Sequence, residues 1–299
     1  MKNFTNQLSE YATIIKNALK QQLKTENFNE YGLAPEKLLA AMRHGSLNGG
    51  KRLRPFLLTE TAAIFDVSPK ITLDAALAIE MVHCYSLIHD DLPSMDDDDM
   101  RRGQASVHKK FNEATAILAG DNLLTFAFEI IATSKNYSPK LKNNLIIELA
   151  KASGAGGMVG GQMLDLDAEN QTLSENEINN IQAMKTGALI CASARMGALI
   201  GGASKKQILS LTKYATNAGW AFQLADDILD ETATIEQMGK ATKKDAERGK
   251  STLVSNIGLE KANKQLATII KAAILALEPF GERANNLIEI AQFFGERKS

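Results

Sequence analysis

Six aspartates stand close together in the segment HDDLPSMDDDDMRRG, which ends at Gly103. They are Asp90, Asp91, Asp96, Asp97, Asp98 and Asp99. Carboxylates at this density repel one another and resist burial unless a cation neutralises them. Pro93 is expected to interrupt a helix here and to turn Asp96 back toward Asp90. The segment therefore predicts a site that binds a cationic partner.

A second acidic group lies in the segment FQLADDILDE. Asp226 and Asp230 share one helix face because they are four residues apart, and Asp227 lies beside them. Carboxylate oxygens suit Mg²⁺, and the absence of an accompanying set of His or Cys ligands favours Mg²⁺ over Zn²⁺. The alternative for either group alone is a solvated acidic helix end. Residues 97–99 fit that alternative, and we expect them to face solvent.

Cationic residues are concentrated in two further segments. In GGKRLRP, Lys51, Arg52 and Arg54 are expected within the first turn of a helix, after two glycines. Backbone N–H groups, the positive helix end and three cations would form a seat for a diphosphate. Arg101 and Arg102 follow the first aspartates directly and supply a second cationic pair.

Other polar residues have weaker individual signals. His83 precedes Asp90 by seven residues and so lies on the same helix face, although a core histidine is an equal alternative. The polar segment GKATKKDAERGKST predicts a loop able to close over a charged ligand, although its lysines taken singly would be ordinary solvated charges. The remaining candidates are Lys185, Thr186, Gln223, Lys240 and Lys250.

Composition limits the classes of partner. The chain of 299 residues has 34 Lys and Arg against 35 Asp and Glu, so no overall field would attract nucleic acid or an anionic membrane. Its two cysteines, Cys84 and Cys191, lie in apolar helical patterns and fit a reducing cytosol. The N-terminus lacks the apolar core of a signal peptide. The most apolar stretch, residues 188–202, is shorter than a membrane span of about 20 residues. We therefore expect a cytoplasmic protein without stable membrane insertion.

Apolar residues recur at spacings of three and four along most of the chain, which predicts an all-α fold without strands. Helices are expected at about 4–29, 35–44, 52–66, 70–91, 111–134, 138–153, 174–202, 205–231 and 259–296, the last one broken near Pro279 and Gly281. No polar linker of the length that separates domains interrupts them. A single domain covering residues 1–299 is therefore expected.

The motifs GGKRLRP, DDLPSMD with RRG, KTG, GGQMLDLD, FQLADDILD and GKST follow one another from residue 49 to residue 252. This ordered set resembles the trans-prenyl diphosphate synthases, and most closely the bacterial farnesyl diphosphate synthases. The resemblance covers most of the chain. It implies a single-domain helical bundle of about ten helices around a deep central cavity, usually as a homodimer.

The resemblance also implies a role for each polar candidate. The metal ligands would be Asp90, Asp96 and Asp226, with Asp91, Asp227 and Asp230 as neighbouring or water-mediated partners. The allylic diphosphate would be held by Arg101, Lys185, Thr186, Gln223, Lys240 and Lys250. Isopentenyl diphosphate would be seated by Lys51, Arg54, His83 and Arg102. The catalytic set would be Asp90, Asp96, Asp226, Lys185, Arg101 and Lys240.

The implied reaction is a head-to-tail condensation of isopentenyl diphosphate with dimethylallyl or geranyl diphosphate. Three Mg²⁺ ions, which Mn²⁺ can replace, and the lysines would neutralise the departing diphosphate. The double bond of isopentenyl diphosphate would attack the allylic cation, and a proton would then be lost to diphosphate. Apolar helices would keep water from the cation.

Product length should depend on residues one turn before Asp90. Tyr85 and Ser86 lie there on the same helix, where the growing chain would arrive. The bulk of Tyr85 should stop growth at the fifteen-carbon farnesyl product. A geranylgeranyl diphosphate synthase is the nearest alternative. A terpene cyclase and a noncatalytic synthase subunit are weaker ones, because Lys51, Arg54 and His83 indicate an isopentenyl site and both aspartate motifs are present.

Overall fold

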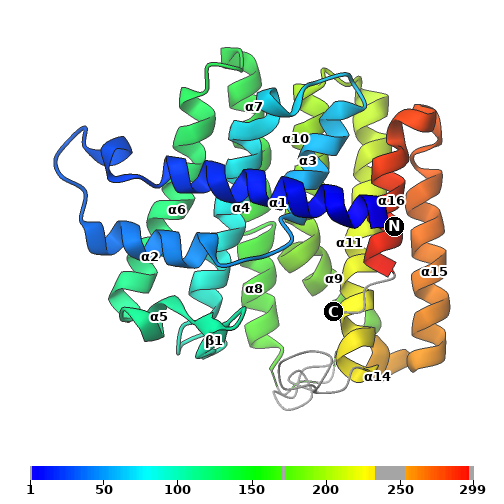
Figure 1. The fold of residues 1–299 in the computed structure, drawn as a ribbon. Coiled ribbons are helices and arrows are strands. Elements are labelled where there is room, and N and C mark those ends of the chain that lie inside the picture. Colours follow the sequence, from blue (N-terminus) through cyan, green and yellow to red (C-terminus); the bar gives the residue numbers. More distant parts are fainter. Residues whose placement is uncertain (1, 170, 172, 233–252, 296–299) are drawn as a thin grey trace. The chain divides into compact units, whose positions relative to one another are not determined.

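The protein is almost entirely helical, as the computed structural model in Figure 1 shows for residues 2–169, 171, 173–232 and 253–295. The only β structure among these described residues is an antiparallel pair of two-residue strands, β1 (Met100–Arg101) and β2 (Gln104–Ala105). The all-α prediction is therefore confirmed. Contacts between residues group the chain into two compact units. The N-terminal unit contains residues 2–59 and 68–146, and the C-terminal unit contains residues 60–67 and the described residues from 147 onward.

The N-terminal unit is built around α4 (Pro69–Asp90), which packs chiefly against α6 (Glu113–Thr133), as Figure 1 shows. Pro69 occupies the first turn of α4, and the Ser68 hydroxyl caps it by accepting from the Lys70 N–H. Helix α4 is apolar on several faces and buries most of its length, as expected for a central helix. The other helical segments of this unit are α1 (Lys2–Gln22), η1 (Thr25–Phe28), α2 (Glu36–Leu47) and α5 (Val107–Lys110).

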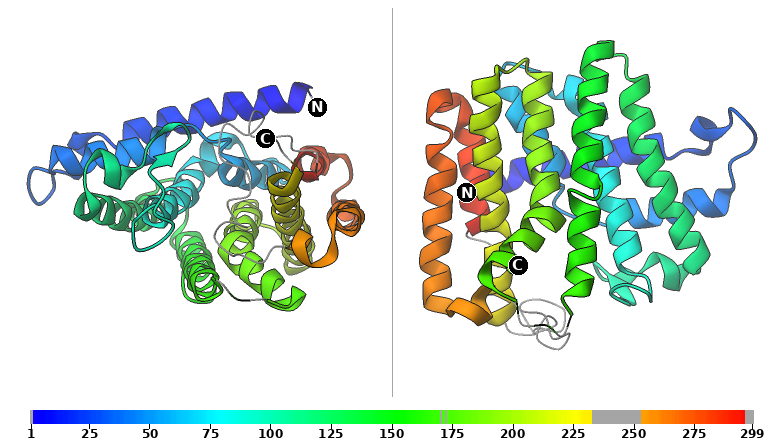
Figure 2. Two further views of the ribbon diagram at one scale, coloured as in Figure 1. Left: turned by 90° about the horizontal axis from the view of Figure 1, so that it is seen from below. Right: turned by 180° about the vertical axis from the view of Figure 1, so that it is seen from behind.

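The C-terminal unit is built around α11 (Lys205–Thr232), beside which α15 (Leu259–Leu275) and α16 (Asn285–Gly295) run, as Figure 2 shows. Tyr214 is buried in α11, and its hydroxyl donates to the carbonyl of Leu287 at 2.7 Å, which ties α16 to α11. The other segments are α8 (Met158–Asp167), α9 (Glu175–Gln182), η2 (Ala183–Gly187), α10 (Ala188–Ile200), α14 (Leu253–Ile257) and η3 (Glu278–Ala284). Two further helices, α3 (Leu53–Ala63) and α7 (Pro139–Ser153), each contain a point at which the chain passes from one unit to the other, and a further such point lies between residues 67 and 68.

Most helix predictions are confirmed, including the break near Pro279, where Gly281 has a φ of 56°. The expectation of no strands missed the β1–β2 pair. Helix α8 was not predicted, because its glycines resemble loop residues. The helix predicted at 174–202 is three segments, α9, η2 and α10, of which η2 is a π-helical turn.

Helices α4 and α6 are long and apolar enough to span a membrane by length and composition. Within the fold, 67% of the most apolar 18-residue stretch of α4 is buried, and 50% of the corresponding stretch of α6 is buried. A helix in a protein core can have the same length and composition as a membrane span. The packing of α4 and α6 against each other therefore explains their apolar character.

Candidate active site

The first aspartate cluster lies where α4 ends, in the N-terminal unit. The N–H of Asp96 donates to the carbonyl of Asp90 at 2.8 Å, and the N–H of Asp98 donates to the carbonyl of Asp91 at 3.2 Å. The predicted turn of the chain after Pro93 is therefore confirmed. The hydrogen bond between them places the backbones of Asp90 and Asp96 side by side. Both residues are half-buried, so this acidic end of α4 is partly sheltered from solvent.

Asp91 differs from its neighbours because its carboxylate is buried against Arg101. Arg101 Nε donates to both carboxylate oxygens, at 2.9 and 3.2 Å, and Arg101 Nη2 also donates to Oδ1. Burial raises the pKa of Asp91, although the hydrogen bonds and charge of Arg101 act in the opposite direction. In this structure Asp91 therefore serves to orient Arg101, a predicted diphosphate ligand.

The two predicted cationic segments meet in the N-terminal unit. Arg102 Nη1 donates to the carbonyl of Gly49 at 2.9 Å. Gly50 has a φ of 97°, and a Cβ there would lie 2.6 Å from Arg102 Nη1. Glycine is needed at this position both for the backbone angle and for the close approach of the guanidinium. Helix α3 begins only at Leu53, so the prediction that Lys51 lies in its first turn is wrong.

Arg52 is not part of the cationic seat, contrary to the sequence interpretation. Its guanidinium is buried, donates to the Glu80 carboxylate and the Ser46 carbonyl, and contacts Cys84 Sγ at 3.7 Å. Arg52 also has left-handed backbone geometry, with a φ of 51°, and its side chain is buried while that of Lys51 is exposed. Arg52 therefore anchors the segment that carries the exposed Lys51 and half-buried Arg54.

His83 lies within the positive field of these arginines. Burial, followed by the charges of Arg54 and Arg102, holds its pKa well below the usual histidine range. His83 is therefore neutral near pH 7 and can donate a hydrogen bond without adding charge. A neutral donor among several cations suits an anionic ligand with several oxygens.

The predicted chain-length residues lie on α4, before Asp90. Tyr85 is buried, and its ring packs edge-on against the ring of His89 with centroids 5.7 Å apart. Burial and the charge of Asp90 raise the pKa of Tyr85 to about 12, so the phenol is neutral. The Ser86 hydroxyl donates to the carbonyl of His83 at 2.9 Å, within the helix.

The second aspartate cluster lies near the C-terminal end of α11, in the C-terminal unit. Asp227 is buried and accepts from Gln182 Nε2 at 3.1 Å, from Gln223 Nε2 at 3.2 Å and from the N–H of Leu253 at 3.4 Å. These donors hold Asp227 in the interior. Asp226 and Asp230 are half-buried on the same helix.

Lys185 and Thr186 lie in the π turn η2 and are linked to other predicted residues of this unit. Thr186 Oγ1 donates to Gln223 Oε1 at 3.2 Å, and Lys185 Nζ pairs with Asp165 at 2.7 Å. A Cβ on Gly161 would lie 2.1 Å from the N of Lys185, so glycine allows α8 to approach η2. Sequence reasoning assigned no role to Asp165, although the motif GGQMLDLD contains it.

The structure thus groups the predicted residues into two sets. The N-terminal unit holds Lys51, Arg54, His83, Tyr85, Ser86, Asp90, Asp91, Asp96, Arg101 and Arg102. The C-terminal unit holds Lys185, Thr186, Gln223, Asp226, Asp227 and Asp230. Lys240 and Lys250 lie outside the described residues. Each set includes half-buried carboxylates together with cationic or amide side chains, a donor set that fits Mg²⁺ and a phosphorylated ligand.

Comparison with known proteins agrees with this chemistry. The polyprenyl synthetase family model matches residues 35–287. The farnesyl diphosphate synthase of Escherichia coli (strain K12) is 48% identical over 251 residues, which cover 83% of this chain and 84% of that protein. The farnesyl diphosphate synthase of Haemophilus influenzae is 42% identical over 305 residues, covering 100% of both chains. The crystal structure of an FPP/GFPP synthase from Zymomonas mobilis has a TM-score of 0.86 and 40% identity, with 97% of this chain and 98% of that chain covered. The chain therefore belongs to the polyprenyl synthetase family.

Proposed function

We propose that this protein is a farnesyl diphosphate synthase, which condenses isopentenyl diphosphate with dimethylallyl or geranyl diphosphate. The observation that carries the proposal is the group of Arg54, His83 and Arg102 in the same unit as Asp90 and Asp96. A reaction that ionises one diphosphate ester needs an aspartate cluster. A second, cationic seat is needed only if another diphosphate takes part.

Both aspartate clusters are proposed to act on the same allylic diphosphate. Asp90, Asp96 and Asp226 would hold three Mg²⁺ ions, with Asp91, Asp227 and Asp230 supporting them. Bound Mg²⁺ would neutralise the charge that builds on the diphosphate as its C–O bond breaks. The donor set of half-buried carboxylates supports this assignment.

The protein's own cations would share in holding the allylic diphosphate. Lys185 pairs with Asp165 in this structure and would exchange that partner for a phosphate oxygen. Arg101 is oriented by Asp91, and Thr186 is oriented by Gln223. These residues would stabilise the charge on the leaving group more strongly in the transition state than in the ground state.

Isopentenyl diphosphate would be seated by Lys51, Arg54, His83 and Arg102. Neutral His83 would donate a hydrogen bond, while the arginines would supply charge. The hydrogen bond from Arg102 to the Gly49 carbonyl supports a binding site that is preorganised for the ligand. The proton lost after condensation would pass to the released diphosphate, so no protein base is required.

The remaining parts of the proposal concern organisation. The family match at residues 35–287 includes parts of both units, which supports a single polyprenyl synthase domain over residues 1–299. We propose a cytoplasmic homodimer, with small isoprenoid diphosphates as its ligands and no nucleic acid.

A product assay separates this function from its alternatives. Purified protein with Mg²⁺, dimethylallyl diphosphate and labelled isopentenyl diphosphate is expected to form a fifteen-carbon diphosphate. A twenty-carbon product would identify a geranylgeranyl diphosphate synthase instead. Consumption of an allylic diphosphate without incorporation of label would indicate a terpene cyclase, and turnover only after addition of another chain would indicate a noncatalytic subunit.

Tyr85→Ala is expected to lengthen the product to twenty carbons or more. Tyr85 lies five residues before Asp90 on α4, about 7.5 Å along the helix axis, where the growing chain would end. Chromatography of the dephosphorylated products measures the shift. Tyr85→Phe keeps the ring and should keep the fifteen-carbon product. A fifteen-carbon product from Tyr85→Ala as well would refute this role.

A further inference from the structure

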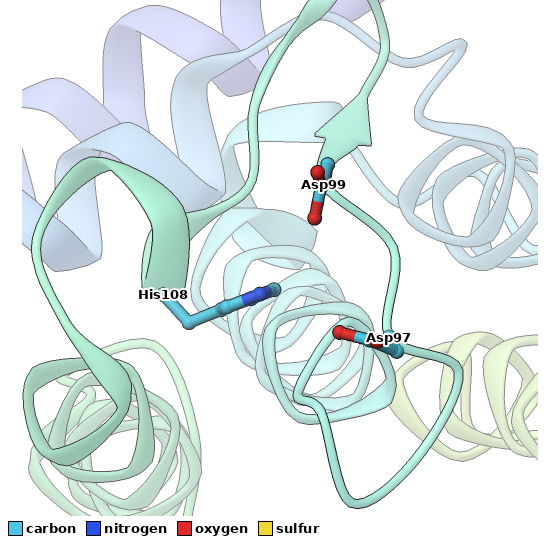
Figure 3. A group of neighbouring side chains, drawn as sticks. All are labelled: Asp97, Asp99 and His108. Carbon is cyan, nitrogen blue, oxygen red and sulfur yellow. The ribbon is translucent and has the colours of Figure 1, made fainter.

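We propose that Asp97, Asp99 and His108 form a binding site for a first-row transition-metal ion, distinct from the Mg²⁺ site. One ligand atom from each of the three residues lies within 4.8 Å of the other two. Figure 3 shows the ring of His108 directed toward the space beside the two carboxylates. Sequence reasoning had treated residues 97–99 as solvated charges and found no set of His or Cys ligands accompanying the aspartates.

His108 supplies the evidence that points to a ligand. His108 is only 6% exposed, and its Nδ1 lies 3.1 Å from the Ser106 hydroxyl oxygen. Nε2 is buried and has no hydrogen-bond partner among the described residues. A buried imidazole nitrogen without a partner is costly, and a metal ion would satisfy it. The bond at Nδ1 would fix the ring, as a second hydrogen bond does for most metal-binding histidines.

The two carboxylates are placed to complete the site. Asp97 and Asp99 are exposed, so their side chains can rotate toward a common ion. The carbonyl of Asp99 accepts from the N–H of Ser106 at 2.9 Å, which joins the aspartate segment to the start of α5. Ligand atoms about 2.1 Å from a tetrahedral ion would lie roughly 3.4 Å apart. The three ligand atoms, which now lie within 4.8 Å of one another, would therefore have to move only slightly closer together to bind an ion.

One imidazole and two carboxylates select a particular class of ion. Imidazole nitrogen favours Zn²⁺, Co²⁺ and related ions, whereas Mg²⁺ prefers oxygen ligands only. Three protein ligands would leave a position for water. Lys109 Nζ now pairs with Asp99 at 2.8 Å, and its side chain is 44% exposed. Lys109 can therefore move into solvent when an ion takes its place.

Equilibrium dialysis against Zn²⁺ in the presence of excess Mg²⁺ tests the proposal. The excess Mg²⁺ occupies the all-oxygen carboxylate clusters, and the metal retained by the full chain is then counted. The unsubstituted protein is expected to retain one Zn²⁺ per chain. Asp97→Asn, Asp99→Asn and His108→Asn each remove a ligand and are each expected to weaken retention by at least about 10–100-fold, the loss typical of removing a partner that only supports a ligand.

Asp66→Asn is the matched control. Asp66 is also exposed and also has a positive φ, 60° against 46° for Asp97, and asparagine tolerates that geometry. This variant should retain Zn²⁺ as the unsubstituted protein does. The Asp97 and Asp99 variants alter exposed side chains, so their result stands even if His108→Asn fails to fold. Absence of Zn²⁺ retention in the unsubstituted protein, or equal retention in all variants, would overturn the proposal, and neither result depends on prenyl transfer.

Discussion

Glu80→Gln is expected to lower the free energy of unfolding by about 3–5 kcal/mol, because it leaves the charge of Arg52 buried without a counterion. The side chains of Arg52 and Glu80 are only 1% and 2% exposed. Among the described residues, the guanidinium also donates to the Ser46 carbonyl and contacts Cys84 Sγ, and neither group carries a compensating negative charge. The change is measured by urea unfolding followed by circular dichroism.

A surface pair provides the comparison for this prediction. Lys264 and Glu260 pair at 2.7 Å across one turn of α15, with side chains 75% and 84% exposed. Glu260→Gln should change the free energy of unfolding by only about 0.3–0.5 kcal/mol. If the two variants lost equal stability, the buried pair would not anchor the 49–54 segment.

Asp226→Asn is expected to reduce kcat by about 10²–10³-fold, the range typical of losing one group that stabilises a leaving or developing anion. Asparagine keeps the shape of the side chain but loses the charge that attracts Mg²⁺. Asp226 stays half-buried near the end of α11, so the substitution should leave the fold intact. Steady-state kinetics with a varied Mg²⁺ concentration measure the effect.

Asp90→Asn should cause a loss of similar size if both clusters act on one diphosphate. The double variant should lose less than the product of the two single losses, because residues that act as a unit are not additive. Asp121→Asn changes an exposed aspartate of α6 and serves as the control with unchanged kcat. Full activity in both single variants would remove the basis for the proposed mechanism.

The helices could be predicted from sequence because their apolar residues recur with helical spacing. Helix α8 was missed because the glycines before and within it resemble a loop. Close approaches of the backbone explain them, since a Cβ on Gly160 would lie 1.9 Å from the Ala155 carbonyl oxygen and a Cβ on Gly161 would lie 2.1 Å from the N of Lys185. The π turn η2 was missed because it, too, depends on contacts with other segments. Its extra residue reflects packing between segments, which periodicity in one segment does not encode.

The candidate site was predictable in composition but less so in the role of each residue. Asp90 and Asp91 are adjacent and chemically identical, yet Asp91 is the one that is buried and forms an ion pair with Arg101 in the described structure. Lys51 and Arg52 are likewise adjacent, yet Lys51 is exposed whereas Arg52, which has a left-handed backbone, is buried. Such differences arise from burial and backbone angle, which a residue pattern does not specify.

The π turn at residues 183–187 has a consequence for insertions and deletions in this chain. Deleting one residue there would remove the extra residue that the wide turn accommodates and would close the turn to a regular α-helix between α9 and α10. Lys185 and Thr186 would then leave the faces from which they reach Asp165 and Gln223. We expect functional variants of this protein to vary in length on either side of this turn but to preserve its register.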